Sequence, residues 1–183
     1  MSDTLMTVVA IFAAAIIMFV FPLMWTANSQ EGISQTTVET LVANFVNEVS
    51  TKGKLTKLDY EDFVYKLYAT GNSFDVEIEI QKLDDNPGKK TIIAYPDKIG
   101  ENIYYSIFTS TILYDANLGI YGTNNTKGEM LLNKGDYIIV NVKNTNITLA
   151  TQIKNFLFKI VGKDTYTIAA SATALIINNG RSS

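Results

Sequence analysis

The sequence predicts an α+β protein in which a long N-terminal helix leads into a small head with a mainly antiparallel sheet of about four strands and packed helices. Three observations predict this class: an unbroken apolar run opens the chain, an amphipathic helical stretch follows it, and alternating strands with helices between them fill the rest. We therefore expect a transmembrane helix at 1-27, an amphipathic helical stalk at 28-52 and an extracytoplasmic α+β head at 53-183.

The opening run from Leu5 to Trp25 is apolar except for Thr7. A helix needs about 20 such residues to cross roughly 30 Å of hydrocarbon. A cleaved signal peptide is the alternative, but no basic residue precedes the run and no A-x-A cut site follows it. The run therefore predicts a retained single-pass anchor in contact with membrane lipid.

The orientation of this anchor has little support from charge, because no Lys or Arg precedes Lys52. The positive-inside rule counts such residues in the short flanks of a span. We favour a cell-membrane protein whose C-terminal head lies outside the cytoplasm.

Four small or special residues stand out within the apolar run. Pro22 removes one helical hydrogen bond, so it predicts a kink about one turn earlier, either as a tolerated membrane proline or as a functional bend. Ala10, Ala13 and Ala14 offer a surface on which helices can approach closely, or they reflect ordinary membrane composition.

Helical periodicity continues past the membrane. Apolar residues recur at a spacing of three and four, at Val38, Leu41, Val42, Phe45, Val46 and Val49. Gly32 is a candidate interruption, but no proline breaks the pattern before residue 50. We expect this apolar stripe to pack on the protein's own head.

The first part of the head predicts a basic loop, a helix and a strand. Gly53 stops the long helix inside "STKGKL", and Thr56 with Asp59 forms a capping box for a helix that Gly71 ends. Strict alternation in "FDVEIEIQ" predicts a half-buried strand at 74-81, and "TIIAYP" predicts a short strand closed by Pro96.

The rest of the head contains one ambiguous segment and several clear ones. Residues 103-112 combine strand-like composition with helical spacing, and we predict a helix there. Further predictions are a short strand near 130-132, a strand in "DYIIVNVKN", an amphipathic helix in "ITLATQIKNFLFKIVG" and a long strand in "DTYTIAASATALII".

The composition excludes most enzyme classes. The chain has no histidine and no cysteine, so triads, thiol nucleophiles and imidazole or thiolate metal sites are absent. A net charge of -3 gives no footprint for nucleic acid, and no segment predicts a cofactor. Asp75, Glu77 and Glu79 share one strand face, but a flat solvated face without a calcium loop does not favour a metal site.

Three stretches carry a family resemblance, namely "VETLVANFVNEVSTKGKLTKLDYEDFVYKLYATGNSFDVEIEI", "NKGDYIIVNVKN" and "TLATQIKNFLFKIVG" with "DTYTIAASA". With the N-terminal helix, they resemble type IV pilin-like proteins. More closely, they resemble the TadE-type pseudopilin-like, membrane-anchored proteins of Gram-positive Tad-like pilus or conjugation clusters. The resemblance spans most of residues 37–174.

The resemblance implies assembly with copies of the same chain or related subunits through the N-terminal helix. It also implies that an early acidic residue, here Asp3, neutralises a neighbour's N-terminal amine; the alternative role is a helix N-cap with Ser2. The chain departs from the pilin pattern because Leu5 stands at the fifth position, where many pilins have glutamate, and because it shows no basic leader or glycine cut site.

Two functions follow as expectations. The first is a non-enzymatic structural subunit of a bacterial pilus, secretion or conjugation apparatus; the second is a monomeric membrane-anchored binding or adaptor module, which exposed tyrosines such as Tyr104, Tyr105, Tyr114 and Tyr121 would serve. The residues expected to form the anchor and assembly helix are Asp3, Leu5, Ala10, Ala13, Ala14, Pro22, Trp25, Leu41 and Phe45.

Overall fold

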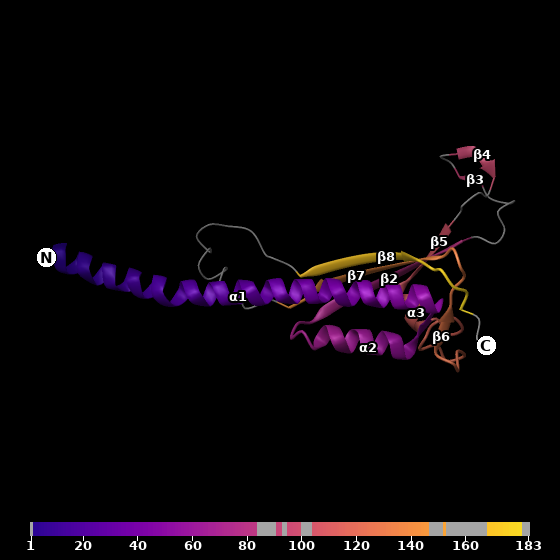
Figure 1. Cartoon of the computed structure of the whole chain (residues 1–183), viewed down its shortest axis with the longest axis horizontal. Helices are drawn as coiled ribbons and strands as arrows, with labels where there is room; N and C mark the ends of the chain where they lie inside the picture. Colours follow the sequence, from indigo (N-terminus) through magenta and orange to yellow (C-terminus); the bar gives the residue numbers. More distant parts are fainter. Residues whose placement is uncertain are drawn as a thin grey trace.

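A long helix and an antiparallel sheet define the architecture, which confirms the predicted α+β class. The computed structural model describes residues 2–83, 91–92, 95–99, 104–146, 152 and 168–180. Helix α1 (Ser2–Lys52) runs along one face of the sheet and projects well beyond it at its N-terminal end (Figure 1). Gly32 does not interrupt α1, and Pro22 lies inside it.

The main sheet has four strands in the order β5-β2-β7-β8, and every neighbouring pair is antiparallel. The strands are β2 (Phe74–Leu83), β5 (Tyr104–Phe108), β7 (Tyr137–Asn144) and β8 (Ala169–Leu175). The register places Ile78 opposite Val140 and Val140 opposite Ala172. Side chains at opposed positions share a face, so these three residues point into the same core.

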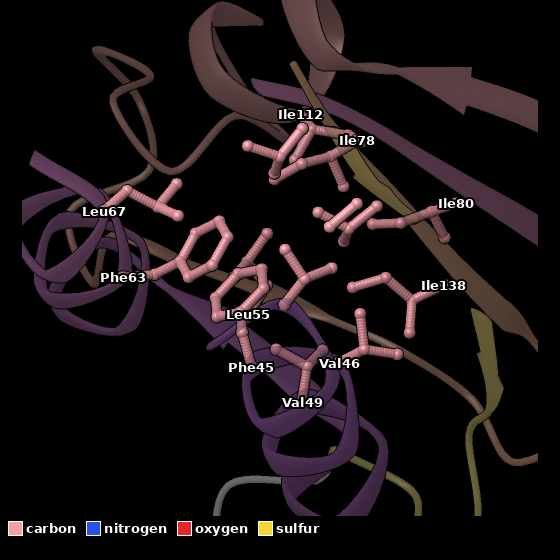
Figure 2. Close-up of a cluster of buried hydrophobic side chains, with 14 of the residues drawn as sticks. Phe45, Val46, Val49, Leu55, Phe63, Leu67, Ile78, Ile80, Ile112 and Ile138 are labelled. Atoms are coloured by element: carbon pink, nitrogen blue, oxygen red, sulfur yellow. The ribbon is translucent and has the colours of Figure 1, made fainter. Parts of the chain in front are cut away.

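The core lies between this sheet face and two helices, α1 and α2 (Lys57–Tyr68). Figure 2 shows side chains from all three layers pointing toward one another. The rings of Phe45 on α1 and Phe63 on α2 stack with centroids 4.2 Å apart. The fully or largely buried members from α1 are Val38, Val42, Phe45, Val46 and Val49. The expectation that the stripe packs on the protein's own head is therefore confirmed.

The junction between α1 and α2 contains a strand where we predicted a basic loop. Gly53 ends α1 with φ of 66°, as predicted, and the capping box between Thr56 and Asp59 is present. Between them, β1 (Lys54–Thr56) pairs antiparallel with β6 (Glu129–Leu131), which confirms the predicted short strand near residue 130. The loop prediction was wrong because a pairing partner 75 residues away is invisible to local charge patterns.

The predicted helix at 103-112 was wrong in its first half. Residues Tyr104–Phe108 form strand β5, and only Thr109–Tyr114 are helical, as α3. The boundary is held by Thr109, whose Oγ1 accepts from the backbone N–H of Ile78 at 2.7 Å. Pairing with β2 thus outweighs the helical spacing, while Ile112 and Leu113 on α3 are buried as a helix face.

A third correction concerns Pro96, which we expected to close a strand. Two short strands, β3 (Thr91–Ile92) and β4 (Tyr95–Ile99), pair antiparallel, and Pro96 lies within β4. A two-stranded sheet consists of edges, where proline is tolerated.

The predicted helix at 147-162 lies outside the described residues apart from Gln152, as does the start of the last predicted strand before residue 168. Within the described part of that strand, Ile168 and Ala170 are buried and Ala169 and Ser171 are exposed, as the alternation predicted.

Candidate membrane-anchor and assembly surface

The apolar half of α1, residues 5–25, is exposed except at Val20 and Met24, which are half-buried. Among the described residues, one helix is long and apolar enough to cross a membrane, and none of its most apolar 18-residue stretch is buried. Leu5 and Trp25, at the two ends of the run, are 69% and 75% exposed. At about 1.5 Å per residue the run is about 31 Å long, which matches the hydrocarbon thickness of a bilayer.

Pro22 lies in this half without ending the helix. Proline has no N–H, so the carbonyl of Met18 loses its usual helical donor. One turn later, the hydroxyl of Thr26 donates to the carbonyl of Pro22 at 3.0 Å. Figure 1 shows α1 changing direction within its apolar half, as expected for a proline in a helix.

A shallow apolar hollow surrounds the proline and is lined by Ile17, Met18, Phe21, Pro22 and Trp25. At 100° per residue, Ala10 and Ala14 lie on the same side of the helix as Ile17, Phe21 and Trp25. The small-residue surface therefore continues into the hollow. Ala13 lies at the margin of this face and is also exposed.

Asp3 lies in the first turn of α1 and not at the N-cap position. The expected N-cap role with Ser2 is therefore wrong, since Ser2 is itself helical. A carboxylate in the first turn is favourable because it faces the positive end of the helix dipole. The backbone carbonyl of Asp3 accepts from the hydroxyl of Thr7 at 2.8 Å.

The two assembly residues expected beyond the membrane lie against the head. Phe45 is 4% exposed and stacks on Phe63, and Leu41 is partly buried against the same core. Phe45 therefore joins the anchor helix to its own head and has no surface to offer a neighbouring chain. Leu41 and Phe45 thus pack in the core of the head, and they do not belong to the exposed apolar face that contains Ala14.

Two polar residues of α1 that we did not single out hold the edge of the sheet. The amide of Gln35 donates to the carbonyl of Ala169 at 2.7 Å and accepts from its N–H at 3.1 Å. The hydroxyl of Ser50 donates to the carbonyl of Leu175 at 2.5 Å. A polar residue next to the apolar stripe at each end of the stalk was the available signal in the sequence.

The spacing of these two contacts matches helix to strand. Gln35 and Ser50 are separated by about 22 Å along α1, and Ala169 and Leu175 by about 20 Å along β8. The first contact pairs the earlier residue of each element and the second pairs the later one. Helix α1 and strand β8 therefore run in the same direction.

Charges fasten the end of α1 to the start of α2. Lys52 forms ion pairs with Glu48 and Asp59, at 2.5 and 2.7 Å. Hydrogen bonds to Asp59 and Glu48 raise the pKa of Lys52. Burial works to raise the pKa of Asp59, but the hydrogen bonds from Lys52 and Thr56 outweigh it and lower that pKa.

A cluster of tyrosines lies on the α2 and α3 side of the head. Tyr121 stacks on Tyr114 at 5.9 Å and meets Tyr60 edge-on at 6.4 Å, while the ammonium of Lys57 lies 5.1 Å from the Tyr121 ring. Burial, followed by the neighbouring Glu61 carboxylate, raises the pKa of Tyr121 to about 12. Tyr114 is exposed and Tyr121 half-buried, so part of the cluster faces solvent.

The acidic face of β2 forms no metal-binding cluster within the described part of the chain. Glu79 instead accepts hydrogen bonds from Ser106 at 2.6 Å and Gln81 at 3.0 Å, and these lower its pKa. Asp75 and Glu77 are exposed on the same face, which faces away from the core.

Comparison with known proteins found no significant match to this chain among protein-family models, curated proteins or solved structures.

Proposed function

We propose that this chain is a non-enzymatic, membrane-anchored, pilin-like structural subunit of an envelope-spanning pilus, secretion or conjugation apparatus, with its head outside the cytoplasm. One observation supports this most: a single helix is both the anchor and part of the core of the head. Its continuous apolar run ends at Trp25, and its stripe of core residues begins at Val38, without any break in the helix between them.

Rigid continuity is useful to a subunit in an assembly. A helix without a linker fixes the position of the head relative to the membrane span, so contacts between spans also set the arrangement of the heads. A tethered binding module gains reach from a flexible linker, and residues 26–37 of this chain are helical instead.

The apolar face is suited to helix packing in lipid. Lipid tails are as apolar as leucine, so membrane helices associate through close packing at small residues. Ala10 and Ala14 provide such a surface, and the hollow near Pro22 extends it by about two turns.

The tyrosine cluster favours a second candidate, a monomeric anchored binding or adaptor module. The partly exposed rings of Tyr114 and Tyr121, with Lys57 beside them, offer an amphipathic surface for a peptide or wall polymer. In this case the apolar half of α1 contacts only lipid.

Single-cysteine crosslinking of the full chain in membranes separates the two. The chain has no native cysteine, so each introduced thiol is unique. Ala14→Cys lies on the small-residue face, and Ile16→Cys, about 200° around the helix, is the matched control. We expect dimers through Cys at position 14 in several-fold excess over position 16. Equal yields at both positions, or monomers only, would support the binding module and contradict the subunit.

A further inference from the structure

Within the described part of the chain, both edges of the main sheet carry backbone N–H and C=O groups that have no hydrogen-bond partner. In an antiparallel ladder, alternate residues point their N–H and C=O groups to opposite sides of the strand. Gln35 and Ser50 form hydrogen bonds with the backbone of Ala169 and Leu175 on the side of β8 that faces away from β7. The backbone N–H and C=O groups of the alternate residues between them, Ser171 and Thr173, therefore point to the same side. Both residues are exposed, and nothing in the described part of the chain bonds to their backbone groups on this edge.

Within the described residues, helix α1 forms hydrogen bonds with the backbone of β8 at its two ends, at Ala169 and Leu175. Between Gln35 and Ser50, the residues that α1 buries against the head include Val42 and Val46, whose side chains neither donate nor accept hydrogen bonds. Within the described residues, the outward backbone groups of Ser171 and Thr173 therefore have no hydrogen-bond partner, and proteins usually cover or charge such strand edges.

The opposite edge of the sheet, at β5, is open in the same way. Thr109 binds Ile78, so Ile78 and Ile80 point their backbone groups toward β5, and Ile80 pairs with Ile107. The backbone groups of Ser106 and Phe108 therefore point away from β2, toward the outer edge of the sheet, and both residues are exposed. Within the described residues, no backbone hydrogen bond joins this outer side of β5 to another segment.

The direction of the strands decides which edges can meet. Strand β8 runs parallel to α1, and three successive antiparallel pairings make β5 run opposite to β8. Copies anchored in one membrane with the same orientation have parallel α1 helices. Antiparallel pairing of β8 with another β8 would require opposed anchors, whereas β8 of one copy beside β5 of the next is antiparallel with all anchors aligned.

From this geometry we propose that a second copy of this chain occupies the β8 edge, with its β5 added antiparallel so that one sheet continues from head to head. The inference rests on the proposed function, because it requires copies that share a membrane. Thr173 pairs with Ser106 of the next copy and Ser171 with Phe108, which keeps the exposed faces of both sheets on the same side.

This register also predicts an axial step. Within one chain, Thr173 is level with Phe108 across the sheet, through Ile139 and Glu79. Pairing Thr173 with Ser106 moves the next copy by two residues, about 7 Å along the strands. The unshifted register would pair Thr173 with Phe108 but would leave Ser171 opposite Ser110, which lies in α3, whereas the shifted register pairs both Ser171 and Thr173 with residues of β5. A repeated head-to-tail contact with a step gives an open helical array.

The sheet contact and the helix contact join different neighbours. Four strands at about 4.8 Å separate adjacent heads by about 19 Å, whereas packed helices lie about 8–10 Å apart. Two copies joined by a continued sheet and related by translation therefore do not touch through their membrane spans. Crosslinks at the strand edges and at Ala14 consequently report independent contacts.

The test mixes two full-length proteins, Thr173→Cys and Ser106→Cys, in vesicles of bacterial phospholipids and oxidises the thiols. We expect disulfide-linked heterodimers as the main product, with few homodimers of either protein. Homodimers through position 173 as the main product would overturn the proposal. Absence of heterodimers in vesicles where Ala14→Cys crosslinks form would also overturn it, and would leave the subunit function standing. If neither edge nor Ala14 crosslinks form, both proposals fail.

A blocking variant adds a matched control. Ser171→Pro in the Thr173→Cys protein removes one outward N–H, and Ser171→Ala keeps it; both lose the hydroxyl that donates to Asn141. We expect Ser171→Pro to lower the heterodimer yield about tenfold, the equivalent of one hydrogen bond of about 1.4 kcal/mol, and Ser171→Ala to leave it unchanged. Equal yields from both variants would contradict strand addition. The pattern of homodimers and heterodimers decides the proposal even if the proline variant does not fold.

Discussion

The two halves of α1 belong to one unbroken helix and have opposite surroundings. Phe12 in the first half is 68% exposed, and Phe45 in the second is 4% exposed and stacked on Phe63. The difference lies in how apolar residues are distributed around the helix. The first half is apolar on all sides, which suits lipid, whereas the second has one apolar stripe bordered by polar residues such as Asn44 and Glu48.

One continuous helix therefore combines a part that packs on the sheet with a part that contacts none of the core of the head. In the second half, burial against the sheet stabilises the helix; in the first, the proposed membrane span would be stabilised by lipid. Variants in the two halves should therefore affect different measurements.

Truncating matched phenylalanines gives the largest contrast. Phe45→Ala leaves a cavity beside Phe63 and should destabilise the head by about 3–5 kcal/mol. Phe12→Ala removes no contact with the head and should leave its stability unchanged. Urea unfolding of both full-length variants in detergent, followed by circular dichroism, measures this. Equal destabilisation by the two variants would mean that both halves of α1 contribute to the stability of the head, which would contradict the contrast.

A lysine on the apolar half should act on membrane insertion alone. Ile16→Lys places a charge at the centre of the span and should cost about 3 kcal/mol in the apparent free energy of insertion. Leu58→Lys is the control, because Leu58 is exposed on the head. Translation into microsomes with a glycosylation reporter measures insertion. An unchanged inserted fraction for Ile16→Lys would show that this segment is not the span.

Removing the hydrogen bonds that join Gln35 of α1 to β8 should have a smaller effect on the stability of the head. Gln35→Ala loses both hydrogen bonds to Ala169, and we expect a loss of about 1–2 kcal/mol in unfolding free energy. In Thr37→Ala only a bond within α1 is lost, to Ile33, so its stability should stay within about 0.5 kcal/mol of wild type. Thermal melts compare the two, and identical melting temperatures would mean that Gln35 does not hold the edge.

The smallest expected effect is a pH dependence of the stability of the head, which comes from the raised pKa of Tyr121. Because the folded pKa of Tyr121, about 12, lies above the ordinary tyrosine value of 10, its stabilising contribution is complete below pH 10 and declines as the pH rises toward 12. Glu61→Gln removes the adjacent negative charge and should lower the pKa of Tyr121. Absorbance titration at about 295 nm, with Tyr121→Phe to identify the late transition, checks the shift. A late transition that persists in Tyr121→Phe would assign it to another tyrosine.

The sequence was most informative where the pattern was local. The capping box at Thr56 and Asp59, the stop at Gly53 and the alternation in β2 each depend on neighbouring residues, and all three are present. The apolar run and the amphipathic stripe likewise predicted the exposed and buried halves of α1.

Features that depend on distant partners could not be predicted in this way. Residues 104–108 have helical spacing, yet pairing with β2 makes them a strand, and β1 exists only because β6 lies beside it. Strand order, which no single stretch of sequence specifies, places β8 and β5 at the two edges of the main sheet. It also decides which strand Gln35 and Ser50 bind.

We infer that the anchor and the head form one rigid body, because an unbroken helix joins them. Spin labels on Trp25→Cys and Asn44→Cys, both exposed, bracket Gly32 and avoid the bend near Pro22. Double electron–electron resonance on the full chain in a bilayer should give one narrow distribution between backbone positions about 28 Å apart, unchanged by Gly32→Ala. A broad distribution at shorter distances, narrowed by Gly32→Ala, would reveal a hinge and contradict the account.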